Sequence, residues 1–143
     1  MATFSTISPP TLTIVNLNAT TVTVKVTYNL LPSAIEKLAG TVFSETIQLI
    51  GNDPGVVSDI VITTFLADAF AVNAATPNTG VARTRTRNVL KSAMNEDPEF
   101  LTTGAEVIDQ TFARIILAYA ASPPIPPALP PPTNTPFVTG AWK

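Results

Sequence analysis

The sequence contains neither cysteine nor histidine, and only 13% of its residues are charged. Without cysteine, the chain has no disulfide framework and no thiolate chemistry. The absence of both residue types also removes the usual ligands of zinc, copper and haem. We therefore predict that the protein uses no cofactor and has no metal site of these kinds.

A concentrated charge of one sign and long apolar runs are also missing. The net charge is −2, whereas binding to nucleic acid needs a concentrated positive surface. No apolar run reaches the length of about 18 residues that suggests a transmembrane helix, and the N-terminal residues lack the basic and apolar regions of a secretory signal. We therefore expect no nucleic-acid partner, no membrane partner and synthesis in the cytoplasm.

Motifs for catalysis are scarce as well. The sequence has no phosphate-binding glycine loop and no serine-nucleophile motif, and no recognisable motif pairs any of its ten acidic residues. The acidic turn at 95–99 lacks the calcium-loop pattern, so we interpret it as an ordinary exposed turn rather than a calcium site. We predict a protein that has no catalytic residues and is not an enzyme.

Alternation of apolar and polar residues predicts an all-β domain over residues 1–121. Strands are expected at 11–17, 21–30, 41–50, 56–65, 81–90 and 105–120. The clearest strand covers residues 21–30, and its buried face is formed by Val22, Val24, Val26, Tyr28 and Leu30. Six or seven strands separated by turns are typical of an immunoglobulin-like β-sandwich.

Three segments interrupt this simple pattern. Residues 31–40 are predicted to form either one or two helical turns capped by Ser33 or a crossover loop, and residues 66–75 fit a strand or a short helix. The alternation in 105–120 is imperfect, so we expect a bulge or a bend near 111–114. Glu45 and Arg114 lie among apolar residues of two strands. They are interpreted as a partly buried pair that fixes sheet register or as charges solvated at strand ends.

Arg83, Arg85 and Arg87 occupy alternate positions of one predicted strand. Their side chains would lie on one face, about 7 Å apart. Such a row would protect an edge strand from unwanted pairing, form ion pairs within the chain, or bind an acidic partner protein. We therefore include the three arginines among the candidate partner-binding residues.

The composition changes abruptly at residue 122, and eight of the fourteen prolines follow it. Proline fixes φ and lacks an amide donor, so residues 122–143 are predicted to form an extended polyproline arm. The arm also carries large apolar side chains, which gain free energy when they dock on a surface. The predicted docking residues are Ile125, Leu129, Phe137, Val138 and Trp142. A semi-rigid tail and a ligand for a proline-recognition domain are the alternatives.

The stretch TVTVKVTYNLLPSAIEKLAGTVFSETIQLIGND (residues 21–53) resembles the early strands of small immunoglobulin-like modules of phage capsid and tail proteins and of contractile injection particles. The resemblance implies a homo-oligomeric or lattice-bound role with no catalytic residues. We therefore expect a structural protein of a virion, particle or filament that associates with copies of itself or another assembly protein. The alternative is a monomeric adhesion or binding module whose arm is a linker or ligand.

Overall fold

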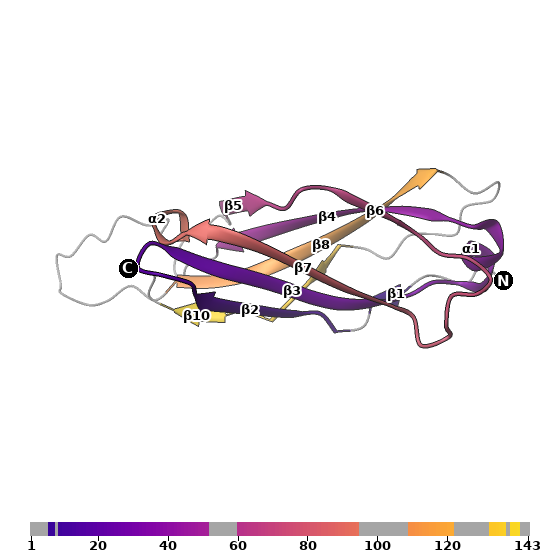
Figure 1. Ribbon diagram of the computed structural model, residues 1–143, viewed down its shortest axis with the longest axis horizontal. Coiled ribbons are helices and arrows are strands. Elements are labelled where there is room, and N and C mark those ends of the chain that lie inside the picture. Colours follow the sequence, from indigo (N-terminus) through magenta and orange to yellow (C-terminus); the bar gives the residue numbers. More distant parts are fainter. Residues whose placement is uncertain are drawn as a thin grey trace.

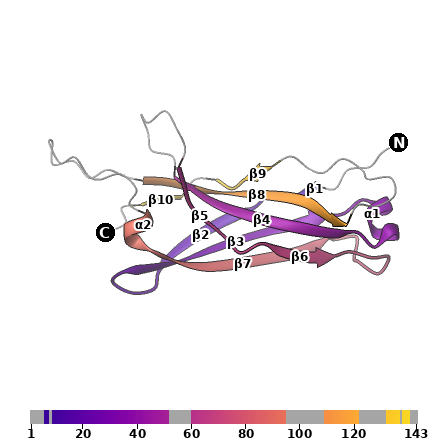
Figure 2. The ribbon, with the colours of Figure 1, turned by 90° about the horizontal axis from the view of Figure 1, so that it is seen from above.

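The computed structural model describes residues 6–7, 9–51, 60–94, 109–121, 132–136 and 138–140. Within these ranges the protein is all-β, with ten strands arranged in two sheets and two short helices. The sheets lie face to face and form an elongated molecule (Figures 1 and 2). None of the described helices is long and apolar enough to span a membrane.

The first sheet, sheet A, is built around the long strand β3 (Thr21–Leu31). One edge of β3 pairs with β1 (Thr6–Ile7) and β2 (Thr11–Asn16), and the other edge pairs with β7 (Val81–Leu90). All of these pairings are antiparallel. Strands β2 and β7 are therefore edge strands of sheet A.

The second sheet, sheet B, has β4 (Val42–Gly51) and β8 (Asp109–Ala121) at its centre. The outer edge of β4 pairs with β5 (Ile60–Thr64) and β6 (Asp68–Ala71). The ambiguous segment 66–75 thus contributes a short strand.

The C-terminal part of the chain completes sheet B. Strands β9 (Thr133–Asn134) and β10 (Val138–Gly140) pair antiparallel with the outer edge of β8. Strand β10 also contacts β2 of sheet A. Two segments of the predicted arm therefore lie on the chain's own sheets.

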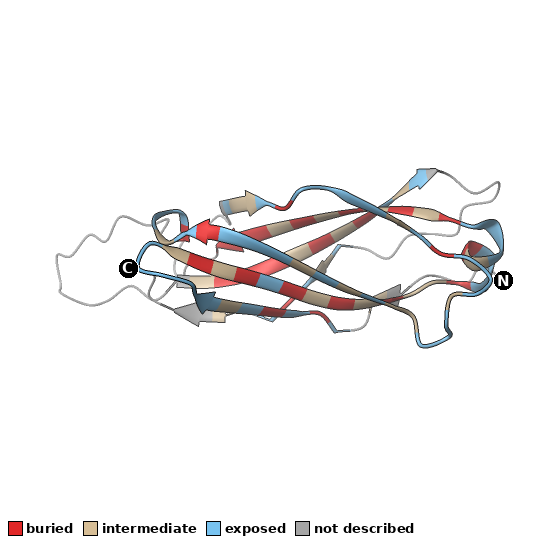
Figure 3. Ribbon diagram, in the orientation of Figure 1, coloured by how far each residue is buried: buried red, intermediate tan, exposed pale blue. Residues whose placement is uncertain are grey.

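The hydrophobic core lies between the two sheets and follows the predicted alternation. The five predicted apolar residues of β3 are all buried, which Figure 3 shows as alternate red segments along this strand. The facing residues come mainly from β4 and β8 and include Phe43, Ile47, Leu49, Ala113, Ile115 and Leu117. The burial of the five β3 residues confirms the predicted inward face of 21–30.

The predicted helical turns are confirmed as α1 (Ala34–Ala39). The Ser33 side chain accepts a hydrogen bond from the Glu36 amide, and the Glu36 side chain accepts one from the Ser33 amide. This reciprocal capping box satisfies two amides that the helix leaves free. Gly40 ends the helix with φ 62°, a left-handed conformation that glycine adopts without strain. A second helix, α2 (Lys91–Met94), follows β7 and was not predicted.

The pairing of β8 with β4 contradicts a bulge near 111–114. The pairing of β8 with β4 is regular from Thr111 to Tyr119, and the register shift lies beyond it, between Phe43 and Val42 of β4. The sequence phase is imperfect because β8 is buried on both faces. Ile115 points into the core between the sheets, whereas Phe112 is buried on the opposite face of the strand.

Candidate functional site

The predicted arginine row lies on β7, an edge strand of sheet A. Arg83 and Arg85 are opposite Tyr28 and Val26 in the register of β3, so their side chains share the inward face of that strand. Both arginine side chains retain only 17% exposure. Arg87 lies further along the strand and is exposed. The structure therefore separates one arginine of the row from the other two.

Glu45 is the centre of the contacts made by the two inward arginines. It lies on the apolar face of β4 between Phe43 and Ile47, and its side chain is fully buried. Arg83 donates hydrogen bonds to both carboxylate oxygens, from Nε at 3.2 Å and from Nη2 at 3.4 Å. Arg85 donates to Glu45 Oε1 through Nη1. One carboxylate of sheet B thus binds two guanidinium groups of sheet A.

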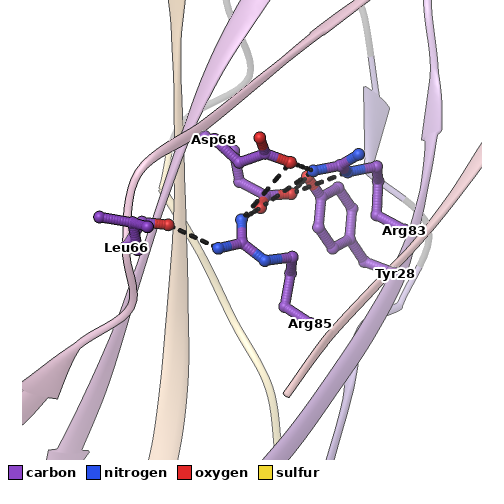
Figure 4. Close-up of polar contacts among 6 residues, drawn as sticks. Tyr28, Leu66, Asp68, Arg83 and Arg85 are labelled. Atoms are coloured by element: carbon purple, nitrogen blue, oxygen red, sulfur yellow. Dashed lines mark hydrogen bonds and ion pairs between the residues drawn. The ribbon is translucent and has the colours of Figure 1, made fainter. Parts of the chain in front are cut away.

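Tyr28, Asp68 and Leu66 complete this cluster (Figure 4). The Tyr28 hydroxyl of β3 donates to Glu45 Oε2. Arg83 Nη2 donates to Asp68 Oδ2 of β6 at 2.6 Å, and Arg85 Nη2 donates to the Leu66 carbonyl at 2.5 Å. The cluster therefore connects strands β3 and β7 of sheet A to β4, β6 and the segment before β6.

The charges within the cluster balance, because two guanidinium groups face two carboxylates. The hydrogen bond from Arg83 lowers the pKa of Asp68, whose side chain is half exposed. Burial alone would lower the pKa of Arg83, but its hydrogen bonds to Glu45 and Asp68 outweigh burial and raise it. Hydrogen bonds within the chain thus favour the charged forms of Asp68 and Arg83.

A second buried carboxylate lies near the α1 end of the sheets. Glu36 is fully buried and accepts a hydrogen bond from the Tyr119 hydroxyl at 2.9 Å, in addition to its capping contact with Ser33. The Phe43 ring lies next to Tyr119, with ring centroids 5.7 Å apart, and stacks on Phe70 at 5.5 Å. The guanidinium of Arg83 lies 4.3 Å from the centroid of the Phe70 ring. A series of contacts through the three aromatic rings and Arg83 therefore connects Glu36 with Glu45.

Stability is expected to fall as the pH rises above about 10, the ordinary pKa of tyrosine. Burial and the hydrogen bond to Glu45 raise the pKa of Tyr28 well above this value. The stability that Tyr28 contributes is complete below the pKa of the unfolded chain and is lost as the pH rises toward the folded-state pKa. Urea titrations at increasing pH should give a slope of about −1.4 kcal/mol per pH unit from this residue.

Tyr28→Phe should remove that part of the slope. Burial and the hydrogen bond to Glu36 also raise the pKa of Tyr119. Tyr119→Phe is therefore the matched variant, and it should remove the part of the slope that Tyr119 contributes. The chain has only two tyrosines, and the ultraviolet absorbance of tyrosinate should therefore develop together with unfolding. Ionisation of Tyr28 in a protein that is still folded would contradict this prediction.

The predicted pair between Glu45 and Arg114 is wrong. Arg114 lies opposite Gln48 in the register of β4 and β8, on the face of sheet B that points away from Glu45. Its Nε donates to Asn134 Oδ1 of β9 at 3.3 Å, and its guanidinium lies 5.8 Å from the centroid of the Phe112 ring. Glu45 is buried, which agrees with one of the two alternatives, but its partners come from the other sheet.

Sequence reasoning missed the contributions of Tyr28 and Asp68. Tyr28 was assigned to the buried face of its strand, and a phenol on a buried face needs a hydrogen-bond acceptor. The arginine row and the acidic residue of the 41–50 strand on an apolar face were two matching signals. Combining these three observations would have suggested the cluster around Glu45.

Among the predicted docking residues of the arm, Val138 lies within the part of the chain that the structure describes. Val138 lies in β10 opposite Thr111 and packs against the core of its own chain, where it is partly buried. Ile125, Leu129, Phe137 and Trp142 lie outside the described residues, as does the acidic turn at 95–99. Docking of these residues on a neighbouring molecule stays a prediction.

Comparison of the chain with protein-family models, curated proteins and solved structures found no match. The assignment of a function therefore depends on the geometry of the chain itself. The geometry of the Glu45 cluster indicates a structural role in holding the two sheets together. Its charged groups bind one another and a backbone carbonyl, and they connect the two sheets on the side where β6 and β7 lie.

Proposed function

We propose that this protein is a non-enzymatic structural subunit of a virus-like or filamentous assembly, with the fold of an immunoglobulin-like β-sandwich. In this proposal the subunits associate through strand edges and through the C-terminal segment. The assembled particle is then the location of the protein, and its partners are copies of itself or another assembly protein.

The order of the strands supports the immunoglobulin-like assignment. Sheet A has the order β2-β3-β7, and sheet B has the order β10-β8-β4-β5. In chain order these strands occupy the places of A, B and E in one immunoglobulin sheet and of G, F, C and C′ in the other. The short strands β1, β6 and β9 extend these edges.

The observation that carries the assembly proposal is the chemistry of the β7 edge. This strand is ten residues long and pairs on one edge with β3. Natural proteins commonly protect such edges with charged side chains. Here the charges of Arg83 and Arg85 are turned inward and neutralised by Glu45 and Asp68, which leaves Arg87 as the exposed charge of this strand. The residues of β7 on the outer face are uncharged and exposed, namely Ala82, Thr84, Thr86, Asn88 and Leu90.

The neighbouring strands continue this uncharged outer surface of sheet A. Cross-strand register places Thr11, Thr27 and Thr84 in one row, and the next row contains Thr13, Lys25 and Thr86. Lys25 is the one charged residue among the outward-facing positions of β2, β3 and β7. A broad surface with so little charge offers little electrostatic repulsion to a second subunit. This supports contact between subunits on this face.

The proposal is tested by the mass of the protein in solution. Size-exclusion chromatography with light scattering should show species well above the single-chain mass of 15.1 kDa, with a mass that rises with concentration. Thr84→Lys adds a charge to the exposed β7 edge and should return most of the protein to the single-chain mass. Thr79→Lys makes the same charge change in the loop before β7 and should leave the mass unchanged.

A monomer at every concentration would overturn the proposal and would favour the monomeric binding module. An oligomer that is equally insensitive to both substitutions would retain self-association but would exclude the β7 edge as its contact.

A further inference from the structure

We propose that copies of this protein join head to tail through sheet A, with the outer edge of β7 in one copy pairing with the outer edge of β2 in the next. This inference rests on the proposed self-association and names both surfaces of the contact. It implies that sheet A continues from each subunit into its neighbour.

The first observation is that the edges of sheet B are interrupted. On one side the edge consists of β9 and β10, which have two and three residues, and Pro136 lies between them. On the other side it consists of β5 and β6, which have five and four residues, and a register shift interrupts the pairing of β5 with β4. Short strands, prolines and bulges protect an edge from pairing with another chain.

The edges of sheet A are continuous by comparison. Strand β7 pairs with β3 over ten consecutive residues and β2 over six, both without a register shift. Neither strand contains proline or glycine. Figure 1 shows the two strands on opposite sides of β3, and within the described residues each pairs with β3 alone. The outer edge of each strand can therefore accept a strand of another molecule.

The second observation is the distribution of charge, which disfavours a symmetric contact between two β7 edges. A twofold axis pairs a strand with its own copy in the antiparallel direction. Because arginines alternate along β7, every such pairing centred at a residue from Arg83 to Arg87 places an arginine opposite an arginine of the other copy. Like charges in opposed positions destabilise a sheet. Arg87 is exposed and has no acidic partner among the described residues.

Strand β2 matches the β7 edge better, because none of its six residues is charged. It therefore brings no positive charge next to Arg87. Most of its residues are β-branched, and these types favour strand pairing. On its outward face Val15 is 57% exposed, so apolar surface remains to be covered on this strand. A β2 strand from a second copy thus fits beside β7 where a second β7 does not.

The directions of the strands allow this contact to repeat. Both β2 and β7 are antiparallel to β3, so they run parallel to each other. A neighbour that is shifted sideways without being turned over presents its β2 to β7 with the same outer face. The threonine rows that contain Thr84 and Thr86 then continue into Thr11 and Thr13 of the next copy. Such a heterologous contact generates an open row of subunits or a ring.

A symmetric contact between two β2 edges is the alternative that charge does not disfavour. It would leave the longer β7 edge uncovered in every copy, whereas the head-to-tail contact uses both edges of sheet A. The two arrangements also differ in size, because the symmetric contact closes at a dimer. Experiments that distinguish the β2 edge from the β7 edge therefore test the inference.

Cysteine crosslinking is the first test, since the chain has no cysteine of its own. Thr13→Cys and Thr86→Cys each place one thiol at an exposed, outward position, on β2 and on β7 respectively. In the head-to-tail row, equivalent strands of adjacent copies are three strand spacings apart, or about 14 Å. A shorter bis-maleimide should therefore give no covalent dimer with either single variant. An equimolar mixture of the two should give the covalent heterodimer.

Leu38→Cys is the control for random collision. Its side chain is 81% exposed on α1, beyond the edges of sheet A. A mixture of Leu38→Cys with Thr13→Cys should give at least tenfold less covalent dimer than the mixture of Thr13→Cys with Thr86→Cys. The yields are compared on a denaturing gel, at a concentration where light scattering shows oligomers.

Complementation of two blocked subunits is the second test. Thr13→Lys places a charge on the β2 edge, and Thr84→Lys places one on the β7 edge. Each variant alone should have the single-chain mass of 15.1 kDa. Mixed together, they should form a one-to-one complex of twice this mass, because the β7 edge of the first and the β2 edge of the second are intact. A symmetric contact predicts no such complex.

The outcomes separate this inference from the proposed function. Covalent dimers of Thr13→Cys alone or of Thr86→Cys alone would show a symmetric contact, which overturns the head-to-tail row and leaves the proposed assembly intact. Oligomers whose Thr13→Cys and Thr86→Cys mixture crosslinks no better than the control would have the same consequence. A protein that is monomeric at every concentration would overturn both.

Discussion

Replacing Glu45 with glutamine is expected to lower the free energy of unfolding by about 3–5 kcal/mol. The glutamine side chain has nearly the same shape, so the change removes charge without leaving a large cavity. Arg83 and Arg85 would then keep two largely buried positive charges without their shared carboxylate. Asp68 is half exposed and contacts Arg83 closely, so it compensates only one of them well.

Urea unfolding monitored by circular dichroism measures this effect as a lower midpoint with an unchanged slope. Arg87→Gln is the matched control, because it removes a charge from the same strand at an exposed position. Its effect should stay within about 0.5 kcal/mol. Equal stability of Glu45→Gln and the natural protein would show that the buried cluster contributes little.

A triple variant distinguishes the value of the cluster from the penalty of breaking it. Replacing Glu45, Arg83 and Arg85 together with leucine or methionine removes every buried charge of the cluster. Apolar replacement of a whole buried ionic cluster is often neutral or stabilising. We therefore expect the triple variant to be more stable than Glu45→Gln alone. If so, the ionic groups serve mainly to fix how sheet A lies on sheet B.

The strands of the core were predictable because their signals are local. Residues 21–30 alternate strictly, and all five apolar residues of this range lie on one buried face of β3. The capping box of α1 was visible in part for the same reason, since Ser33 and Glu36 are three residues apart. Such features depend on backbone geometry that a short segment carries by itself.

The partners of Glu45 were not predictable from periodicity alone. Alternation assigns a side chain to a face, but it does not say which strand of the other sheet lies across from it. Arg114 and the β7 arginines were therefore equivalent candidates until the register of each sheet was known. Alternation did not assign β8 a single buried face for a related reason. Phe112 and Ile115 are buried on opposite faces of this strand.

The C-terminal segment shows what amino-acid composition alone does not predict, namely short strands at the edge of a sheet. Abundant proline after residue 122 correctly argued against a central strand, and the prediction extended this argument to the whole arm. Strands β9 and β10 occupy the edge of sheet B, where backbone pairing is needed on one edge of the strand. Docking of the C-terminal segment on a neighbouring chain stays a prediction.

Replacing Phe43 with alanine is expected to destabilise the protein by about 3–5 kcal/mol. The Phe43 side chain is fully buried and contacts the rings of Phe70 and Tyr119. Its removal leaves a cavity and also withdraws support from both neighbours. Phe70 lies under the guanidinium of Arg83, and Tyr119 donates to the buried Glu36. Urea unfolding measures the loss, and Leu38→Ala on the exposed face of α1 is the control.

A double-mutant cycle shows whether Phe43 acts through these neighbours. Phe43→Ala and Tyr119→Leu change two rings in contact, so their effects should depart from additivity by about 0.5–3 kcal/mol. Val89→Ala removes buried volume near the far end of β7, and its effect should add to that of Phe43→Ala within about 0.5 kcal/mol. Additivity in both cycles would mean that Phe43 fills space without connecting the two buried carboxylates.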